Sequence, residues 1–281
     1  MTKKTKKIKR TPNFVVFLVE GESDTIILET ALSDMIYKKN PDFEVRFLLQ
    51  QKLVNKSGDE MDDSEDDEDD SIIEEYELGG DITSSSFVKP ENIEKKITTR
   101  FITPATKSEG LYPKYIAKII HIVDIDGVYI PDENVIPLSS EHERHDGIYY
   151  CGEAGIMETP SIENTRSRNK QKRMNLDYLL SMQDQKIKIG SKLIPYEIYY
   201  FSSNMDHFIN NDANLKRGKR ALADKFLRSH LSTPLFCKYF LEDEDSLGKK
   251  GYWESWDEIR KGTNSIRRHT NIDCLIRSLM E

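Results

Sequence analysis

Two apolar runs of this chain end in acidic residues that could hold a metal ion. The segment IIHIVDIDGVYIPD, residues 119–132, ends its apolar run at Asp124 and Asp126, and the earlier segment FVVFLVEG ends at Glu20. Magnesium prefers carboxylate oxygens and usually retains several waters, so one Glu and two Asp are a suitable ligand set for one or two ions. Alternation along an extended Asp-x-Asp points both aspartates to the same side. The residue types and spacing therefore predict a metal-dependent hydrolytic centre.

Elements of an α/β fold are expected to position these acids. Residues 14–21, 43–49, 119–125 and 195–203 are typical of strands, the first and third of them buried on both faces, and the segment SDTIILETALSDMIYKK is typical of a helix with Ser23 or Asp24 as its N-cap. Such alternation predicts a parallel sheet flanked by helices. Functional groups gather at the carboxyl ends of parallel strands, so Glu20, Asp124 and Asp126 converge if their strands are neighbours.

The predicted sheet divides the chain into two parts. A catalytic α/β domain covers residues 13–210, and a mainly α-helical C-terminal region covers residues 211–281. Residues 56–86 are too polar to bury a core and are expected to form a disordered acidic insertion. The segment GIYYCGEAGIM is expected to be a hairpin or an irregular crossover.

The two acidic motifs resemble those of a known domain. FLVEGESDTIILETAL followed by IIHIVDIDG resembles a Toprim domain, the magnesium-binding α/β unit of topoisomerases, primases and overcoming-lysogenization-defect (OLD) nucleases. The form VEGESD is most similar to the OLD-type nucleases and to Toprim effectors of bacterial antiphage systems, and the resemblance covers about residues 13–207. It implies four parallel strands between helices and Mg²⁺ or Mn²⁺ held by Glu20, Asp24, Asp124 and Asp126.

The resemblance also bears on the type of enzyme and on accessory residues. Val128 stands where topoisomerases and many primases have a further acid, which favours a stand-alone nuclease. Related nucleases often carry Ser-Asn followed by an acid after the last strand, where this chain has SSNMDHF. Asp206 is thus a candidate outer ligand or water-positioning group, and His207 is a candidate for proton transfer. His121, inside an apolar strand, is expected to be a core residue.

Two other functions remain open. Haloacid-dehalogenase (HAD)-like phosphatases also begin with an apolar strand ending in DxDG, and would use Asp124 as nucleophile and Asp126 as acid and base. No later apolar strand of this chain ends in their paired acidic motif, and VEGESD would be unexplained. A non-catalytic interaction module could instead use the acidic insertion as a docking surface.

The charge distribution permits a nucleic-acid partner despite a net charge of −8. Residues 59–77 contain 13 acidic residues and no Lys or Arg, and without them 36 acidic residues face 41 basic ones. Basic clusters contact phosphates without reading sequence. The candidate nucleic-acid-binding residues are Arg166, Arg168, Lys170, Lys172, Arg173, Lys216, Arg217, Lys219 and Arg220.

Composition and resemblance together complete the expected function. Three scattered cysteines predict neither a disulfide framework nor a zinc site, and no apolar run reaches the roughly 20 residues that cross a bilayer, so a cytoplasmic protein is expected. The resemblance implies an antiviral, abortive-infection nuclease that cleaves RNA such as tRNA, with an OLD-type DNA endonuclease as the alternative. Because the chain has no Gly-x-x-x-x-Gly-Lys-Ser/Thr motif, control by a separate ATPase partner is expected. A homo-oligomer remains open.

Overall fold

A computed structural model of the chain describes residues 13–54, 60, 75–142 and 147–281. The expectation of disorder for residues 56–59 and 61–74, within the acidic insertion, lies outside the described residues. The rest of that expectation is wrong, because residues 75–78 form a strand and residues 82–84 a 3₁₀ turn.

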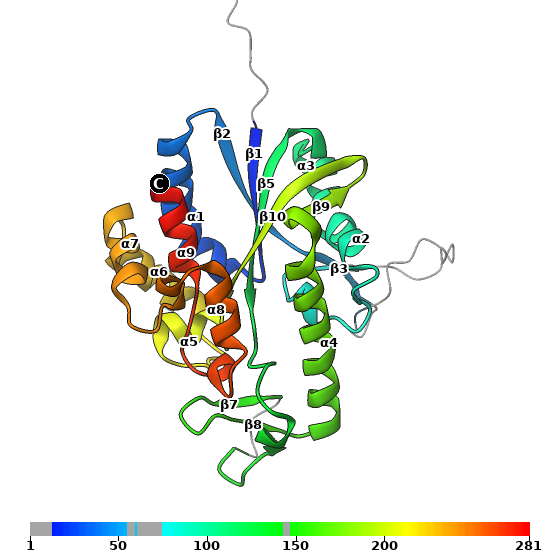
Figure 1. Ribbon diagram of the computed structural model, residues 1–281, viewed down its shortest axis with the longest axis vertical. Helices are drawn as coiled ribbons and strands as arrows, with labels where there is room; N and C mark the ends of the chain where they lie inside the picture. Colours follow the sequence, from blue (N-terminus) through cyan, green and yellow to red (C-terminus); the bar gives the residue numbers. More distant parts are fainter. Residues whose placement is uncertain (1–12, 55–59, 61–74, 143–146) are drawn as a thin grey trace, which may run out of the picture.

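The centre of the molecule is a five-stranded sheet in the order β2-β1-β5-β10-β9 (Figure 1). The first four strands are parallel and β9 runs antiparallel to β10 at one edge. Strand β1 is apolar along almost its whole length because it is buried on both faces. This arrangement confirms the predicted α/β fold with a mostly parallel sheet. The strands span Asn13–Val19 (β1), Phe43–Leu49 (β2), Ile116–Asp124 (β5), Lys186–Ile189 (β9) and Lys192–Phe201 (β10).

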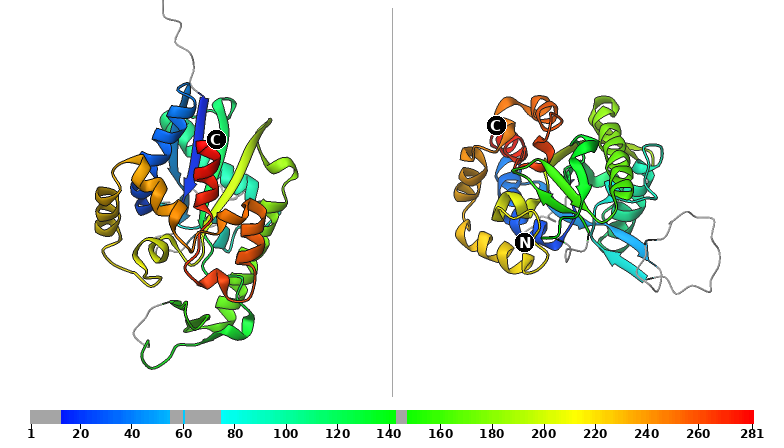
Figure 2. Two further views of the ribbon diagram at one scale, coloured as in Figure 1. Left: turned by 60° about the vertical axis from the view of Figure 1, so that its left-hand side comes forward. Right: turned by 90° about the horizontal axis from the view of Figure 1, so that it is seen from below.

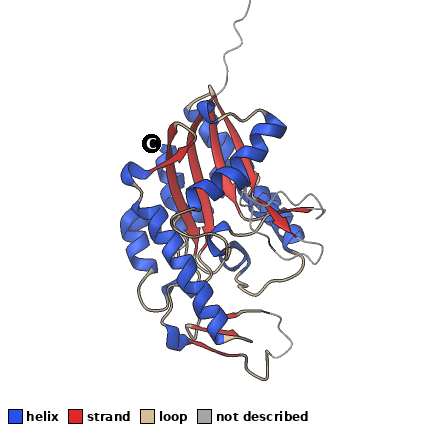
Figure 3. Cartoon of the chain, turned by 90° about the vertical axis from the view of Figure 1, so that its right-hand side faces the viewer, coloured by secondary structure: helices blue, strands red, loops and turns tan. Residues whose placement is uncertain are grey.

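Helices lie on both sides of the sheet in Figure 1, and the turned view in Figure 3 shows its strands side by side among them. One hydrophobic cluster packs β1 and β5 against α1 (Glu22–Lys39), α5 (Met205–Asn210), α6 (Lys219–Ser229), α7 (Thr233–Glu242) and α9 (Ile272–Met280). On the other face the cluster contains α2 (Ile93–Ile97), α3 (Thr103–Glu109), α4 (Ile162–Ser181) and α8 (Tyr252–Ile259). The C-terminal helices therefore share the core of the sheet instead of forming a core of their own.

Two small β-elements extend the fold around the carboxyl end of the sheet. Strands β3 (Gln51–Val54) and β4 (Glu75–Leu78) form an antiparallel hairpin that projects from one side (Figure 2). Strands β6 (Val135–Pro137), β8 (Ile156–Thr159) and β7 (Tyr149–Cys151) form a separate sheet in that order. The β7–β8 pair is antiparallel, so of the two alternatives expected for GIYYCGEAGIM the hairpin is the one that forms.

No helix in the described part of the chain combines the length and the apolar character that crossing a membrane requires.

Candidate metal centre

Glu20 and Asp124 meet at the carboxyl ends of two adjacent strands. Strands β1 and β5 pair in parallel, with Leu18 opposite His121, so Glu20 and Asp124 emerge at the same edge. The backbone N–H of Asp124 donates to Glu20 Oε1 at 2.8 Å, and Asp124 Oδ1 accepts from the backbone N–H of Met205 at 3.0 Å. The predicted convergence of these two acids is therefore present, and backbone donors fix one oxygen of each.

Asp126 lies in a turn and not in the strand. Strand β5 ends at Asp124, and Asp126 has a left-handed φ of 55° followed by Gly127 at 67°. The side-chain alternation of an extended strand thus does not apply, although the turn still brings Asp126 to the centre. Both of its carboxylate oxygens accept hydrogen bonds, Oδ1 from the Tyr150 hydroxyl at 3.1 Å and Oδ2 from Lys172 Nζ at 2.8 Å.

Asp81 is a member of this centre that sequence reasoning missed. Its segment follows β4 and crosses the end of β1, where the N–H of Gly80 donates to the carbonyl of Glu20 at 2.7 Å. Gly79 permits this approach, because its φ is +94° and a Cβ there would lie 2.9 Å from that carbonyl oxygen. Asp81 then begins the 3₁₀ turn η1 (Ile82–Ser84) and accepts from the N–H of Thr83 at 2.8 Å.

A buried lysine joins two of the carboxylates. Lys172 on α4 is fully buried, and its Nζ lies 2.5 Å from Asp81 Oδ2 and 2.8 Å from Asp126 Oδ2. Burial alone would lower the pKa of Lys172, but Asp126 and Asp81 raise it above its ordinary value, so the ammonium stays charged. The prediction that Lys172 contacts nucleic acid is wrong for this arrangement, since its charge is used inside the centre.

Asp24 is anchored by the start of α1. The helix begins at Glu22 with Gly21 as its N-cap, so the prediction of Ser23 or Asp24 in that position is wrong. Asp24 Oδ2 instead accepts from the backbone N–H groups of Glu20 and Gly21 at 3.0 and 2.9 Å. Burial raises the pKa of Asp24 to about 6, although these two hydrogen bonds oppose the shift. These two hydrogen bonds hold the backbone of Glu20 and Gly21, between β1 and α1, in place.

The accessory residues lie on α5, whose first residue, Met205, donates its N–H to Asp124. Asp206 is buried and forms an ion pair with Lys219 Nζ at 2.7 Å. His207 Nδ1 lies 2.9 Å from Ser203 Oγ, whose hydroxyl donates to the carbonyl of Ile266 at 2.9 Å. Since Ser203 has only one proton to donate, it accepts from His207 Nδ1–H and leaves Nε2 as the proton acceptor. Burial, followed by the charge of Arg268, lowers the pKa of His207 to about 4, so the ring is neutral at neutral pH.

A groove of about 590 Å³ opens beside these residues. It is lined by Tyr150, which donates to Asp126, and by His207. Arg267 and Arg268 also line it; the first is exposed, and the second forms ion pairs with Asp243 and Asp245. Glu153 and Asp212 line it as well, so its wall carries charges of both signs, and the hydrogen bond of Tyr150 to Asp126 links it to the acidic centre.

The remaining predicted basic residues have two kinds of surroundings. Lys170, Lys216, Arg217, Lys219 and Arg220 are exposed, the last two paired with Asp206 and Glu22. Arg166, Arg168 and Arg173 are half-buried on α4 and contact the turn after β5: Arg166 and Arg173 bind the backbone and side chain of Asp132, and Arg168 binds the carbonyl of Asp126. These three arginines therefore hold the segment that follows β5 and carries Asp126.

The electrostatics of the centre fit a divalent cation. Burial, then the charges of Asp81 and Asp124, raises the pKa of Glu20 well above its ordinary value. Burial, then the charges of Asp24 and Asp126, does the same for the pKa of Asp124. Glu20, Asp24 and Asp124 each have one carboxylate oxygen that accepts no hydrogen bond within the described residues. Oxygen donors with a surplus of negative charge match the preference of Mg²⁺ or Mn²⁺. In the described residues no three of these acids place one oxygen each within 4.8 Å of the others, so a bound ion would draw the carboxylates closer together.

Comparisons of the chain with protein-family models, with curated proteins and with solved structures found no match.

Proposed function

We propose that this chain is a metal-dependent nuclease built on a Toprim-like domain. The observation that carries the proposal is the meeting of Glu20 and Asp124 at the carboxyl ends of adjacent parallel strands, with Asp81 and Asp126 beside them. The VEGESD and DIDG motifs that resemble those of Toprim nucleases supply these acids. The exposed Arg267 in the groove beside Tyr150 supports a substrate that carries phosphate.

The residues of the centre would divide the work of hydrolysis. Glu20, Asp24 and Asp124 would hold Mg²⁺ or Mn²⁺ through their remaining oxygens. Such an ion, when bound, activates water and stabilises the oxygen that leaves the phosphorus. Both oxygens of Asp126 already accept hydrogen bonds, from Tyr150 and Lys172, so Asp126 would hold these two groups in place and would not be the metal ligand expected from the sequence. His207 Nε2 is a neutral base in the groove and would accept a proton, while Arg267 would hold a phosphate.

The substrate and the control of this nuclease are inferred from the resemblance. The resemblance to Toprim effectors of antiphage systems favours RNA such as tRNA as the substrate of this chain, and cleavage of DNA by an OLD-type nuclease is the alternative. The absence of a Walker A motif in this sequence supports control by a separate ATPase partner. Expression of the chain with and without an ATPase encoded beside it would test that control, and toxicity that is equal in both would contradict it.

Cleavage assays with purified protein test the nuclease itself. End-labelled tRNA and duplex DNA are incubated with Mg²⁺, with Mn²⁺ or with EDTA. We expect cleavage of tRNA with either ion, none with EDTA and none by Asp124→Asn. The control Glu29→Gln removes an exposed acid of α1 and should keep the wild-type rate. Cut DNA beside intact tRNA would favour the OLD-type alternative.

A second substrate separates the phosphatase alternative. A HAD-like phosphatase would hydrolyse p-nitrophenyl phosphate and would depend on Asp124 but not on Glu20. In this chain the Asp124 N–H donates to Glu20, so the two acids lie in direct contact and a nuclease is expected to need both. Phosphatase activity that survives Glu20→Gln, with no cleavage of nucleic acid, would overturn the nuclease proposal.

A further inference from the structure

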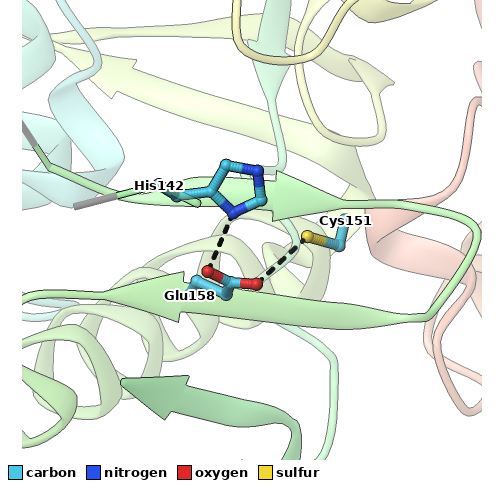
Figure 4. Close-up of side chains that lie close together, drawn as sticks. All are labelled: His142, Cys151 and Glu158. Carbon is cyan, nitrogen blue, oxygen red and sulfur yellow. Dashed lines mark hydrogen bonds and ion pairs between the residues drawn. The ribbon is translucent and has the colours of Figure 1, made fainter. Parts of the chain in front are cut away.

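A second group of metal-ligating side chains lies in the small sheet away from the acidic centre. Cys151 on β7, Glu158 on β8 and His142 from the preceding turn place one ligand atom each within 4.8 Å of the others (Figure 4). His142 Nδ1 lies 3.0 Å from Glu158 Oε2, and Cys151 Sγ lies 3.7 Å from Glu158 Oε1. The three residues form no metal-binding spacing along the chain, so no zinc site is expected from the sequence.

Strand pairing brings these residues together. Tyr149 pairs with Glu158 and Cys151 with Ile156, which puts Cys151 diagonally across from Glu158 on one face of the hairpin. The turn formed by residues 139–142 is closed by the N–H of His142 donating to the carbonyl of Ser139. The His142 ring stacks on Tyr149 with a centroid separation of 3.6 Å. Packing thus directs the imidazole toward the carboxylate.

The donor set and its spacing fit a zinc-like ion. One thiolate, one imidazole and one carboxylate are ligands that Zn²⁺ takes in tetrahedral sites, whereas Mg²⁺ rarely binds sulfur. Tetrahedral bonds of about 2.0–2.3 Å place neighbouring ligand atoms roughly 3.4–3.6 Å apart. The two separations of 3.0 and 3.7 Å bracket that range, and the third pair of ligand atoms, from His142 and Cys151, lies within 4.8 Å.

We propose that His142, Cys151 and Glu158 bind a Zn²⁺ ion that holds the β7–β8 hairpin in place. A water molecule would take the fourth position, and the Cys151 thiol would lose its proton to solvent on binding. Tyr150, next to Cys151 in the chain, points to the opposite side of β7 and donates to Asp126. The ion therefore fixes the strand that delivers Tyr150 to the acidic centre.

Cobalt substitution tests this site directly in the full-length chain. The protein is purified without a metal-affinity step, dialysed against a chelator and titrated with CoCl₂. Cobalt bound by Cys151 gives a thiolate-to-cobalt charge-transfer band in the near ultraviolet and strong visible bands of a tetrahedral ion. Cobalt held only by the carboxylates of the acidic centre gives neither. We expect the band to saturate at one equivalent and to vanish when one equivalent of Zn²⁺ is added.

Matched variants assign the band to its ligands. Cys151→Ser should abolish the band. Glu158→Gln should weaken cobalt binding by more than about tenfold, because loss of a residue that only supports a metal ligand already costs about that much and Glu158 is a ligand itself. Cys274→Ser and Asp124→Asn should leave it unchanged, because neither residue belongs to the cluster. A wild-type protein without the band, or a band that persists in Cys151→Ser, would overturn the proposal and reduce the cluster to a hydrogen-bonded group. None of these readouts depends on nuclease activity.

Discussion

Replacing Lys172 with methionine should destabilise the metal-free protein strongly. The substitution keeps most of the buried side-chain volume but removes the ammonium that lies 2.5 Å from Asp81 and 2.8 Å from Asp126. Removing one partner of a buried ion pair costs about 3–5 kcal/mol, because the remaining charge is left uncompensated. For a domain of this size we expect the melting temperature in EDTA to fall by roughly 10 °C. Urea unfolding of Lys172→Met and wild type gives the free-energy difference.

Two further variants test the cause of that loss. Lys170→Met removes an exposed lysine from the same helix and should change the free energy of unfolding by less than about 0.5 kcal/mol. Adding Asp81→Asn to Lys172→Met should restore at least about 1 kcal/mol, because it removes one of the unpaired charges. Mg²⁺ should also stabilise Lys172→Met more than wild type. If Lys172→Met were as stable in EDTA as Lys170→Met, the role of Lys172 as the internal counter-ion would be refuted.

Three other changes probe the neighbouring structure. Burial lowers the pKa of His121 from 6.5 to about 4, so its share of stability is present above pH 6.5 and is lost as the pH falls toward 4. Urea unfolding across this window should show that the free energy of unfolding of the wild type falls by up to about 3 kcal/mol, a decrease that His121→Gln lacks. An equal pH dependence of the two proteins would contradict the lowered pKa of His121. Gly79→Ala should cost about 1–3 kcal/mol and weaken Mn²⁺ binding, because its Cβ would press on the Glu20 carbonyl. Gly147→Ala, with a similar φ of +97° and open space around its Cβ, is the control in calorimetry, and equal Mn²⁺ affinity in the two variants would exclude the clash. His207→Ala should lower the cleavage rate by about 10²- to 10⁴-fold without changing Mn²⁺ affinity, as loss of a general base does. Wild-type cleavage by that variant would remove His207 from the reaction.

The strands and the first two acids could be predicted from the sequence because their signals are local. An uninterrupted apolar run ending in an acid indicates both a buried parallel strand and the edge at which it ends, which is enough to place Glu20 and Asp124. The two acids were expected to meet if their strands were neighbours in a parallel sheet, and β1 and β5 are paired in that way.

The rest of the centre depends on contacts between distant segments. Asp81 follows a long acidic stretch in which no residue stands out, and only the glycine pair before it signals a close backbone approach. Lys172 lies among basic residues that all look like surface charges, because burial of one position on α4 depends on what packs against it. His142, Cys151 and Glu158 have no metal-binding spacing along the chain, and the hairpin alone brings them together.

The most direct test is the Mg²⁺ dependence of RNA cleavage by wild type and by Glu20→Gln. The substitution keeps the size of the side chain and the acceptor for the Asp124 N–H, so the fold is retained while the charge of a metal ligand is lost. Circular dichroism confirms the fold, and Glu22→Gln, an exposed neighbour, is the matched control. We predict cleavage that rises with Mg²⁺ in wild type and Glu22→Gln and is absent in Glu20→Gln at every concentration. Cleavage by Glu20→Gln at the wild-type rate, or wild-type cleavage that persists in EDTA, would contradict a metal-dependent nuclease at this site.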